Sequence, residues 1–196
     1  MNENELMEKY GLKKTNAIIL FIQMLLTIGG TVLALVMLVR TLSSAHTALD
    51  VLGNVVSLLA YLGLILYAVR NYSKKGDLYF QGVIYAFAAV VGVQILQNGM
   101  FISDYGLSES AALFISIVDI IVFGNAIKFA DSLNNKTTAL CYIGIGTALK
   151  LGAELYLIIL MANYIQFIHI LLALSVPIMG ITLIVTYLTR CYKQGL

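Results

Sequence analysis

The sequence predicts an all-α, polytopic integral membrane bundle of six transmembrane helices with both termini in the cytoplasm. Three observations lead to this fold class: the composition, the spacing of the apolar runs, and the placement of Lys and Arg. Of the 196 residues, 60% are hydrophobic and 11% are charged, and the mean hydropathy is +0.92. Soluble domains contain about 25% charged residues, so a chain this apolar needs lipid as the solvent for most of its surface.

The second observation is a series of long apolar runs. A helix that spans a bilayer needs about 20 apolar residues, so six runs and short connectors use the whole chain as one transmembrane domain, residues 1–196. Backbone groups in lipid must be satisfied internally, and these runs are far longer than a barrel strand, so we expect helices. The expected spans are residues 17–39, 51–69, 79–102, 111–129, 139–161 and 165–189.

The third observation is an uneven distribution of positive charge. Lys and Arg favour the cytoplasmic side of a membrane. One set of chain ends and connectors carries Lys9, Lys13, Lys14, Arg70, Lys74, Lys75, Lys128, Lys136, Arg190 and Lys193. The opposite connectors hold Arg40, His46, Asp104 and Glu109. This bias predicts cytoplasmic N- and C-termini in a plasma (inner) membrane.

The residues able to carry chemistry are the polar ones inside the spans. An ionisable group at the centre of a membrane helix costs about 2.5–3.5 kcal/mol, so each needs a partner, water or a function. Lys150 and Glu154 are one helical turn apart, and we expect Lys150 to contact a carboxylate, either Glu154 or Asp119. The candidate ligand-binding residues are Asp119, Lys150, Glu154, Gln94, Gln97, Asn98 and His169.

The predicted topology brings these groups to one depth. At a rise of 1.5 Å per residue, Asp119 lies about 12 Å below the outer end of its span, with Lys150 near the midplane. The inner half of the spans reads as nearly pure hydrocarbon. The pattern predicts a polar pocket open to the outside. The alternative for the three amides is a structural role, in which hydrogen bonds between helices contribute about 0.6 kcal/mol each to stability. The alternative for His169 is a position at the lipid headgroups.

Small residues indicate where helices approach closely. A strip of small residues spaced by four in the fifth span lets a neighbouring backbone approach, so we expect this span at the centre of the bundle. The expected helix-packing residues are Gly144, Ala148, Gly152, Gly53 and Ser57. Pro177, the only proline, lies in the sixth span and predicts a kink, either a static bend or part of a moving gate.

These features favour a protein of small-solute transport or capture. Two carboxylates and one lysine give the pocket a formal charge of about −1 with a neutral imidazole, which favours a small polar ligand, neutral or cationic. One protonated carboxylate would instead make binding proton-linked. The span count and cytoplasmic termini are similar to those of the substrate-binding subunits of energy-coupling-factor vitamin transporters. The small-residue pattern of alanines in the first helix of those subunits is not found here.

Two other functions remain open. The polar groups can join helices in a non-catalytic assembly or regulatory subunit, which would bind a membrane protein partner or a second copy of the chain. An intramembrane enzyme would use Asp119, Glu154 and His169 as acid and base. It is the weakest hypothesis, because no nucleophile motif, metal-ligand spacing or nucleotide loop occurs. We expect no cofactor, no metal, no catalytic residue and no nucleic-acid partner. The expected partners are the lipid bilayer, a small polar or cationic ligand, and a membrane protein partner or a second copy of the chain.

The orientation can be tested with the two native thiols. Cys141 and Cys191 lie near the predicted cytoplasmic face, so both should react with an impermeant thiol reagent only after the inner face is opened. Labelling of Cys191 on intact cells would reverse the orientation.

Overall fold

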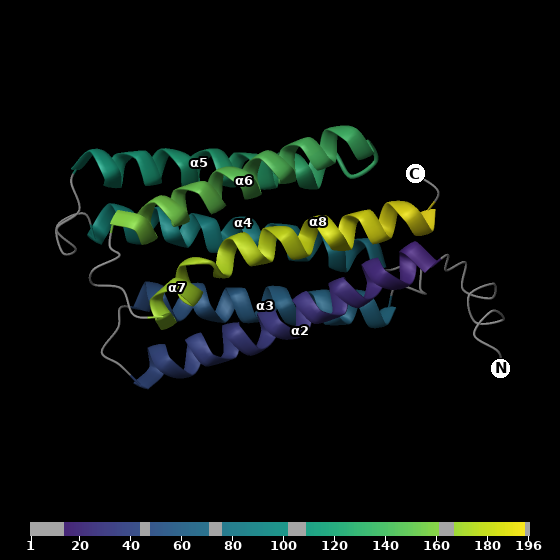
Figure 1. Cartoon of the computed structure of the whole chain (residues 1–196), viewed down its shortest axis with the longest axis horizontal. Helices are drawn as coiled ribbons and strands as arrows, with labels where there is room; N and C mark the ends of the chain where they lie inside the picture. Colours follow the sequence, from purple (N-terminus) through teal and green to yellow (C-terminus); the bar gives the residue numbers. More distant parts are fainter. Residues whose placement is uncertain (1–13, 44–47, 71–75, 102–108, 161–166, 195–196) are drawn as a thin grey trace.

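The chain folds as a bundle of antiparallel helices (Figure 1). The computed structural model describes residues 14–43, 48–70, 76–101, 109–160 and 167–194. These residues are helical apart from Leu174 and the turn at 132–135, and they contain no strand, which confirms the all-α class. The helices are α2 (Lys14–Ser43), α3 (Ala48–Arg70), α4 (Gly76–Phe101), α5 (Glu109–Asp131), α6 (Lys136–Leu160), α7 (Phe167–Ala173) and α8 (Ser175–Gln194).

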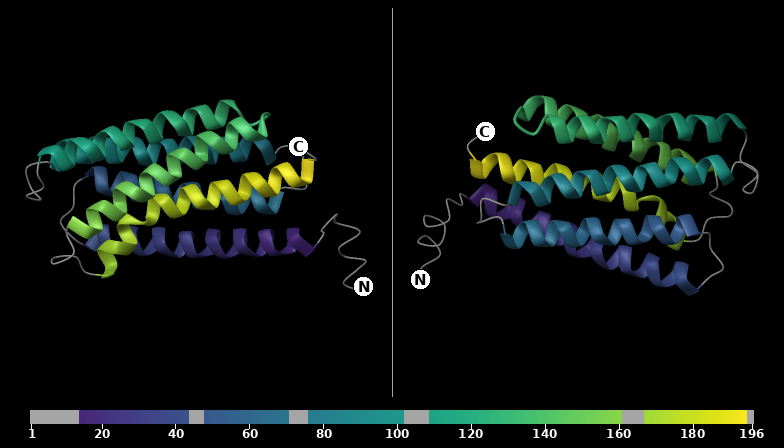
Figure 2. Two further views of the ribbon diagram at one scale, coloured as in Figure 1. Left: turned by 45° about the horizontal axis from the view of Figure 1, so that its top comes forward. Right: turned by 180° about the vertical axis from the view of Figure 1, so that it is seen from behind.

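Consecutive long helices run in opposite directions and pack side by side. Contacts join α2 to α3, α3 to α4, α4 to α5 and α5 to α6, and α8 closes the bundle against α2, α6 and α4. The start of α2 and the end of α8 lie at the same end of the bundle (Figures 1 and 2). That end, which also holds the α5–α6 turn, is termed the inner end, following the expected orientation, and the opposite end is termed the outer end.

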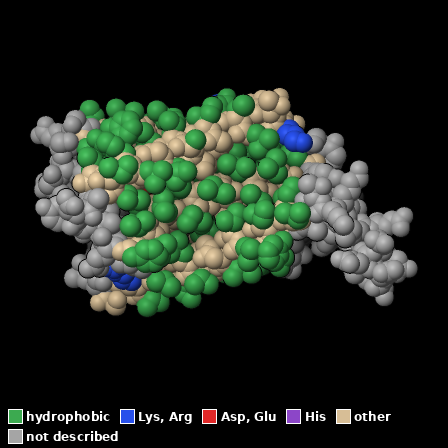
Figure 3. Space-filling model, in the orientation of Figure 1, with side chains coloured by type: hydrophobic (Ala, Val, Ile, Leu, Met, Phe, Trp, Pro, Cys, Tyr) green, Lys and Arg blue, Asp and Glu red, His purple; other side chains and the backbone are tan. Residues whose placement is uncertain are grey.

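The outside of the bundle is apolar. By length and composition, α2, α5 and α6 could each cross a membrane, and α3, α4 and α8 contain shorter apolar runs. Large hydrophobic side chains such as Phe21, Leu42 and Ile159 are more than half exposed. Figure 3 shows one face covered by hydrophobic side chains, with Lys and Arg near its two ends. A surface of this kind is compatible with a membrane protein.

The expected sixth span is two helices. α7 ends at Ala173 and α8 begins at Ser175, and Figure 2 shows the change of direction between them. Pro177 has no N–H to donate to the carbonyl of Ala173, and its ring crowds that carbonyl. Leu174 N still bonds Ile170 O at 3.0 Å, and Ile178 N bonds Leu174 O at 3.0 Å, so the chain bends without losing its helical course. The kink is confirmed, and the single helix over 165–189 is corrected to two.

Glycines set the closest helix contacts. A Cβ on Gly30 of α2 would overlap the ring of Tyr61 on α3, and one on Gly53 of α3 would lie 3.2 Å from Val93 Cγ1 on α4. Close approach at small residues is the main route to dispersion contacts between helices in lipid. Ser57 follows Gly53 by one turn, and its hydroxyl donates to the Gly53 carbonyl at 2.9 Å.

The strip of small residues on α6 faces away from the other described helices, on the side of the bundle. A Cβ on Gly144 or Gly152 would meet no atom within 4 Å, and Ala148 is exposed. Among the described helices, α6 packs on α5, α7 and α8, whereas α4 is flanked by α3, α5 and α8. The expectation that residues 139–161 form the central helix is therefore wrong, and α4 is the central helix of the described part. On α6 the buried face contains Lys150 and Glu154, and the strip of small residues lies on the other side.

The two cysteines differ in accessibility. Cys141 is exposed, whereas Cys191 is fully buried. The expectation that both thiols react is corrected, since packing alone protects Cys191. Only Cys141 can report on orientation.

Gly29 and Gly30 form a matched pair that tests the α2–α3 contact. Gly30→Ala should destabilise the protein by about 1–3 kcal/mol, because a new methyl group overpacks a well-filled interior. Gly29 faces open space, so Gly29→Ala should be neutral or stabilising by up to about 1 kcal/mol through helix propensity. Unfolding in mixed micelles would measure both. Equal stability of the two variants would show that Tyr61 does not pack against Gly30.

Candidate functional site

A buried ammonium group joins two carboxylates between α5 and α6. Lys150 Nζ lies 2.6 Å from Asp119 Oδ1 and 2.8 Å from Glu154 Oε1. The side chains of Asp119 and Lys150 are 0% and 2% exposed, and that of Glu154 is 8% exposed. Both distances are short, and Lys150 Nζ donates a hydrogen bond to Asp119 Oδ1. The expected contact of Lys150 with a carboxylate is confirmed, and it involves both candidates; these three residues are termed the ion triad.

Two antiparallel helices bring the ion triad to one depth. Asp119 lies ten residues after Glu109, where α5 begins, and Lys150 lies ten residues before Leu160, where α6 ends. At 1.5 Å per residue, both are about 15 Å from the outer end, and Glu154 is about 9 Å from it. The register of the α5–α6 hairpin therefore places an acid on one helix opposite a base on the other, in the outer half of the bundle.

The ion triad holds one positive and two negative formal charges. Lys150 compensates one carboxylate, and the second negative charge is left in excess within the group. Taking a charge out of water costs several kcal/mol per ion, so each charge of the ion triad needs an ion pair or hydrogen bonds to compensate it. Asp119 makes a further interaction, and Glu154 is the most exposed member. Among the described residues, no group of three His, Cys, Asp or Glu could hold a metal.

Of the four other candidate ligand-binding residues, only Gln94 has a side chain within the described part of the structure. Gln94 lies on α4 about 11 Å from the outer end, the same layer as Glu154. It is half-buried, and its Oε1 is buried without a hydrogen-bond partner among the described groups. Gln97 and Asn98 lie on α4 and His169 on α7, but their side chains are outside the described part. The structure thus joins Asp119, Lys150 and Glu154 directly and places Gln94 at their depth.

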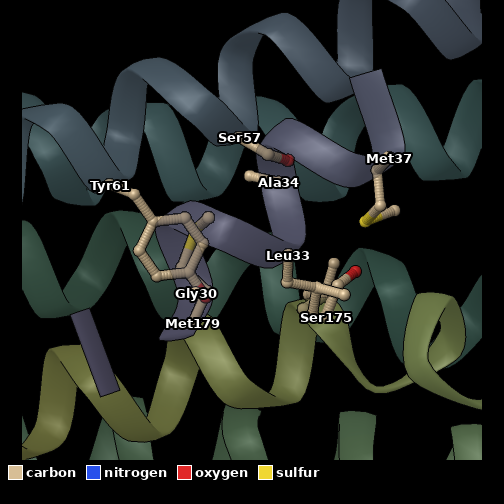
Figure 4. A pocket seen from close by; sticks show the side chains of 9 residues that line it. Gly30, Leu33, Ala34, Met37, Ser57, Tyr61, Ser175 and Met179 are labelled. Carbon is tan, nitrogen blue, oxygen red and sulfur yellow. The ribbon is translucent and has the colours of Figure 1, made fainter. Parts of the chain in front are cut away.

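A cavity of about 10 Å³ lies elsewhere, between α2, α3 and α8 (Figure 4). Its walls are mostly apolar, with Ser57, Tyr61 and Ser175 as the polar members, and it has room for about one water molecule. None of the seven candidate residues lines it. This cavity is therefore not the expected ligand pocket.

Buried polar residues in the inner half were missed from the sequence. The expectation of nearly pure hydrocarbon there is wrong, because Thr182, Thr186 and Thr189 on α8 and Gln23 on α2 are all buried. These side chains are uncharged, so the cost of burying an ionisable group does not single them out in the sequence. The three threonines recur at i, i+4 and i+7, which places them on one helix face, and this face points into the bundle.

Removing the ammonium group tests the ion triad. Breaking a buried ion pair at one partner costs about 3–5 kcal/mol, because an uncompensated charge stays buried. We expect Lys150→Met to destabilise the protein by this order in mixed-micelle unfolding. Lys128→Met is the matched control: Lys128 is exposed on α5, and such surface changes stay within about 0.5 kcal/mol. Equal small effects of both variants would contradict the observed pairing.

The chain matches no protein-family model, no curated protein and no solved structure. Its function has to be inferred from its own side chains and their geometry.

Proposed function

We propose that this chain is a six-span membrane protein that takes up or captures a small polar solute, neutral or cationic, from the outer side. The observation that carries the proposal is the ion triad: one ammonium shared by two carboxylates, buried in the outer half of the bundle. Ionisable residues inside a membrane are costly and by default mark substrate or ion sites.

Helix lengths and end charges support the six spans. The shortest long helix, α8, has 20 residues, which at 1.5 Å per residue is about 30 Å, the thickness of a bilayer's hydrocarbon core. The six long helices of the described part alternate in direction (Figure 1), and the excess of Lys and Arg in the sequence falls at chain ends and connectors of the inner end. This placement favours cytoplasmic termini, and labelling of Cys141 alone now tests it.

The charge balance selects the ligand. A solute with a positive charge or several hydrogen-bond donors would offset the excess negative charge of the ion triad, whereas an anion would add to it. Glu154 is the member nearest the outer end and the least buried, so it is the first to meet a solute from that side. The unpartnered Oε1 of Gln94 adds an acceptor at the same depth, and acceptors also select donors and cations.

A subunit that binds another membrane protein is the second candidate. It is favoured by the small-residue strip of α6, because Gly144 and Gly152 face open space in the single chain. Strips of this spacing serve as helix contacts in membranes. The ion triad would then hold the α5–α6 hairpin together and bind nothing.

A panel of small metabolites and inorganic cations separates the two candidates. Under the proposal, one class of cation or neutral donor raises the melting temperature of the purified protein, and Asp119→Asn and Glu154→Gln abolish the rise. Asp131→Asn is the matched control, because Asp131 is an exposed acid on α5 at the inner end. That variant should keep the full response.

Two results would reject solute binding at the ion triad. One is a panel without any stabilising compound for the unsubstituted protein. The other is a response that survives both triad substitutions, which would place the ligand elsewhere. In the first case, the subunit function would be the better account.

A further inference from the structure

The part of α8 that follows Pro177 is anchored at the inner end of the bundle. Tyr187 Oη donates to the carbonyl oxygen of Leu133 at 3.0 Å, and Arg190 Nη1 donates to the same oxygen at 3.3 Å. The ring of Tyr187 also stacks on Phe80 of α4, with the ring centroids 6.3 Å apart and the planes at 8°. α8 is thereby tied both to the turn between α5 and α6 and to α4.

α7 is packed less tightly than α8. Its main contacts are with α6 and α8. None of the α7 side chains that the structure describes is buried, and Phe167, the first residue of the helix, is 74% exposed. In α8, by contrast, Val176, Pro177 and Met179 are all buried. Segments with few buried contacts are those that open most readily, so the resistance to motion changes sharply between the two helices.

The two helices meet at a joint with backbone freedom. Pro177 has no N–H, so the carbonyl of Ala173 receives no helical hydrogen bond from it. Leu174 lies between the two helices and belongs to neither. Residues 174–177 are termed the hinge. Hinges in proteins are short stretches of this kind, at the ends of elements, that absorb a change in φ and ψ.

Free space lies directly beside the hinge. The cavity of about 10 Å³ between α2, α3 and α8 is lined on α8 by Ser175, Val176 and Met179, which lie on both sides of Pro177 in the chain (Figure 4). Protein interiors are normally filled to the density of a crystal. Side chains at the hinge therefore have room to shift when the angle between the helices changes.

α7 lies at the end of the bundle from which a solute would enter. It packs against α6, whose buried face carries Lys150 and Glu154, and Figure 2 shows it turned away from the axis of α8 at the outer end. Glu154 is the least buried member of the ion triad and the nearest to that end. A rotation of α7 about the hinge therefore changes the packing on α6 at its outer end.

We infer that α7 is a gate that pivots about the hinge while α8 stays fixed. In the arrangement of the structure α7 rests against α6, and in the second arrangement it has moved away from α6. Phe167 is seven residues from Leu174, about 10 Å along a helix, so a rotation of about 30° moves it by about 5 Å. The role of this motion in admitting a solute rests on the proposed function, whereas the motion itself needs no solute.

Distances between pairs of spin labels test the gate. In a Cys141→Ser background, with the buried Cys191 left in place, labels would be attached at Phe167→Cys on α7 and Leu113→Cys on α5, two exposed positions. The matched control pair joins Leu113→Cys to Ile181→Cys, which is exposed on α8. Pulsed electron–electron double resonance on the full chain in lipid nanodiscs should give a distance distribution at least twice as broad for the α7 pair as for the α8 pair.

Pro177→Ala separates a hinge from general looseness of α7. The substitution returns an N–H that can bond the Ala173 carbonyl, so the distribution of the α7 pair should narrow to the width of the control pair. A distribution that stays broad in the folded variant would overturn the inference, because the motion would not depend on the hinge. A distribution of the unsubstituted hinge as narrow as that of the control pair would show a static bend, and this comparison holds even if Pro177→Ala does not fold.

The outcome is separable from that of the proposed function. A moving α7 without any stabilising solute would leave the gate standing and reject solute binding at the ion triad. A stabilising solute with a static α7 would leave the binding site standing and reject the gate.

Discussion

The ammonium of Lys150, held between two carboxylates, is the interaction on which the interior depends. It lies 2.6 Å from Asp119 on α5 and 2.8 Å from Glu154 on α6. A buried charge is tolerated only with good geometry and partners, so this contact fixes the register of the α5–α6 hairpin. Gln94 lies at a similar depth, and its buried Oε1 has no hydrogen-bond partner among the residues that the structure describes. Stability requires the three side chains of the ion triad to pair with one another, whereas the proposed binding requires them to contact a solute.

The rest of the described bundle has an apolar exterior and an interior that is mainly hydrophobic, with a minority of buried polar side chains. Large side chains such as Phe21 and Ile159 face outward, while Thr182 and Thr186 face inward. Glycines such as Gly30 bring helices close enough to pack without a hydrophobic driving force. After the break before Pro177, α8 packs against α2, α4 and α6. Close packing and buried threonine hydroxyl groups therefore coexist on one helix.

The sequence predicted the helical class, the number of long helices and the pairing of Lys150, because hydropathy and the cost of a buried charge act locally. It predicted that Asp119, Lys150 and Glu154 lie in one layer of the bundle, because the rise per residue is constant. It misplaced the strip of Gly144, Ala148 and Gly152, since spacing identifies a helix face but not the neighbour it meets. It also missed the threonines of α8, whose hydroxyls satisfy their own backbone and give no charge signal. The place of Gln97, Asn98 and His169 at the site stays a prediction.

The most direct test of the ion triad is a double-mutant cycle across the two helices. Lys150→Met, Asp119→Asn and the double variant would be unfolded in mixed micelles, and the coupling free energy obtained from the three losses of stability. A direct contact predicts that the double variant loses less than the sum of the single variants, by about 1 kcal/mol or more. Losses that add to within about 0.5 kcal/mol would show that Lys150 and Asp119 do not interact, and the account of the site would fail.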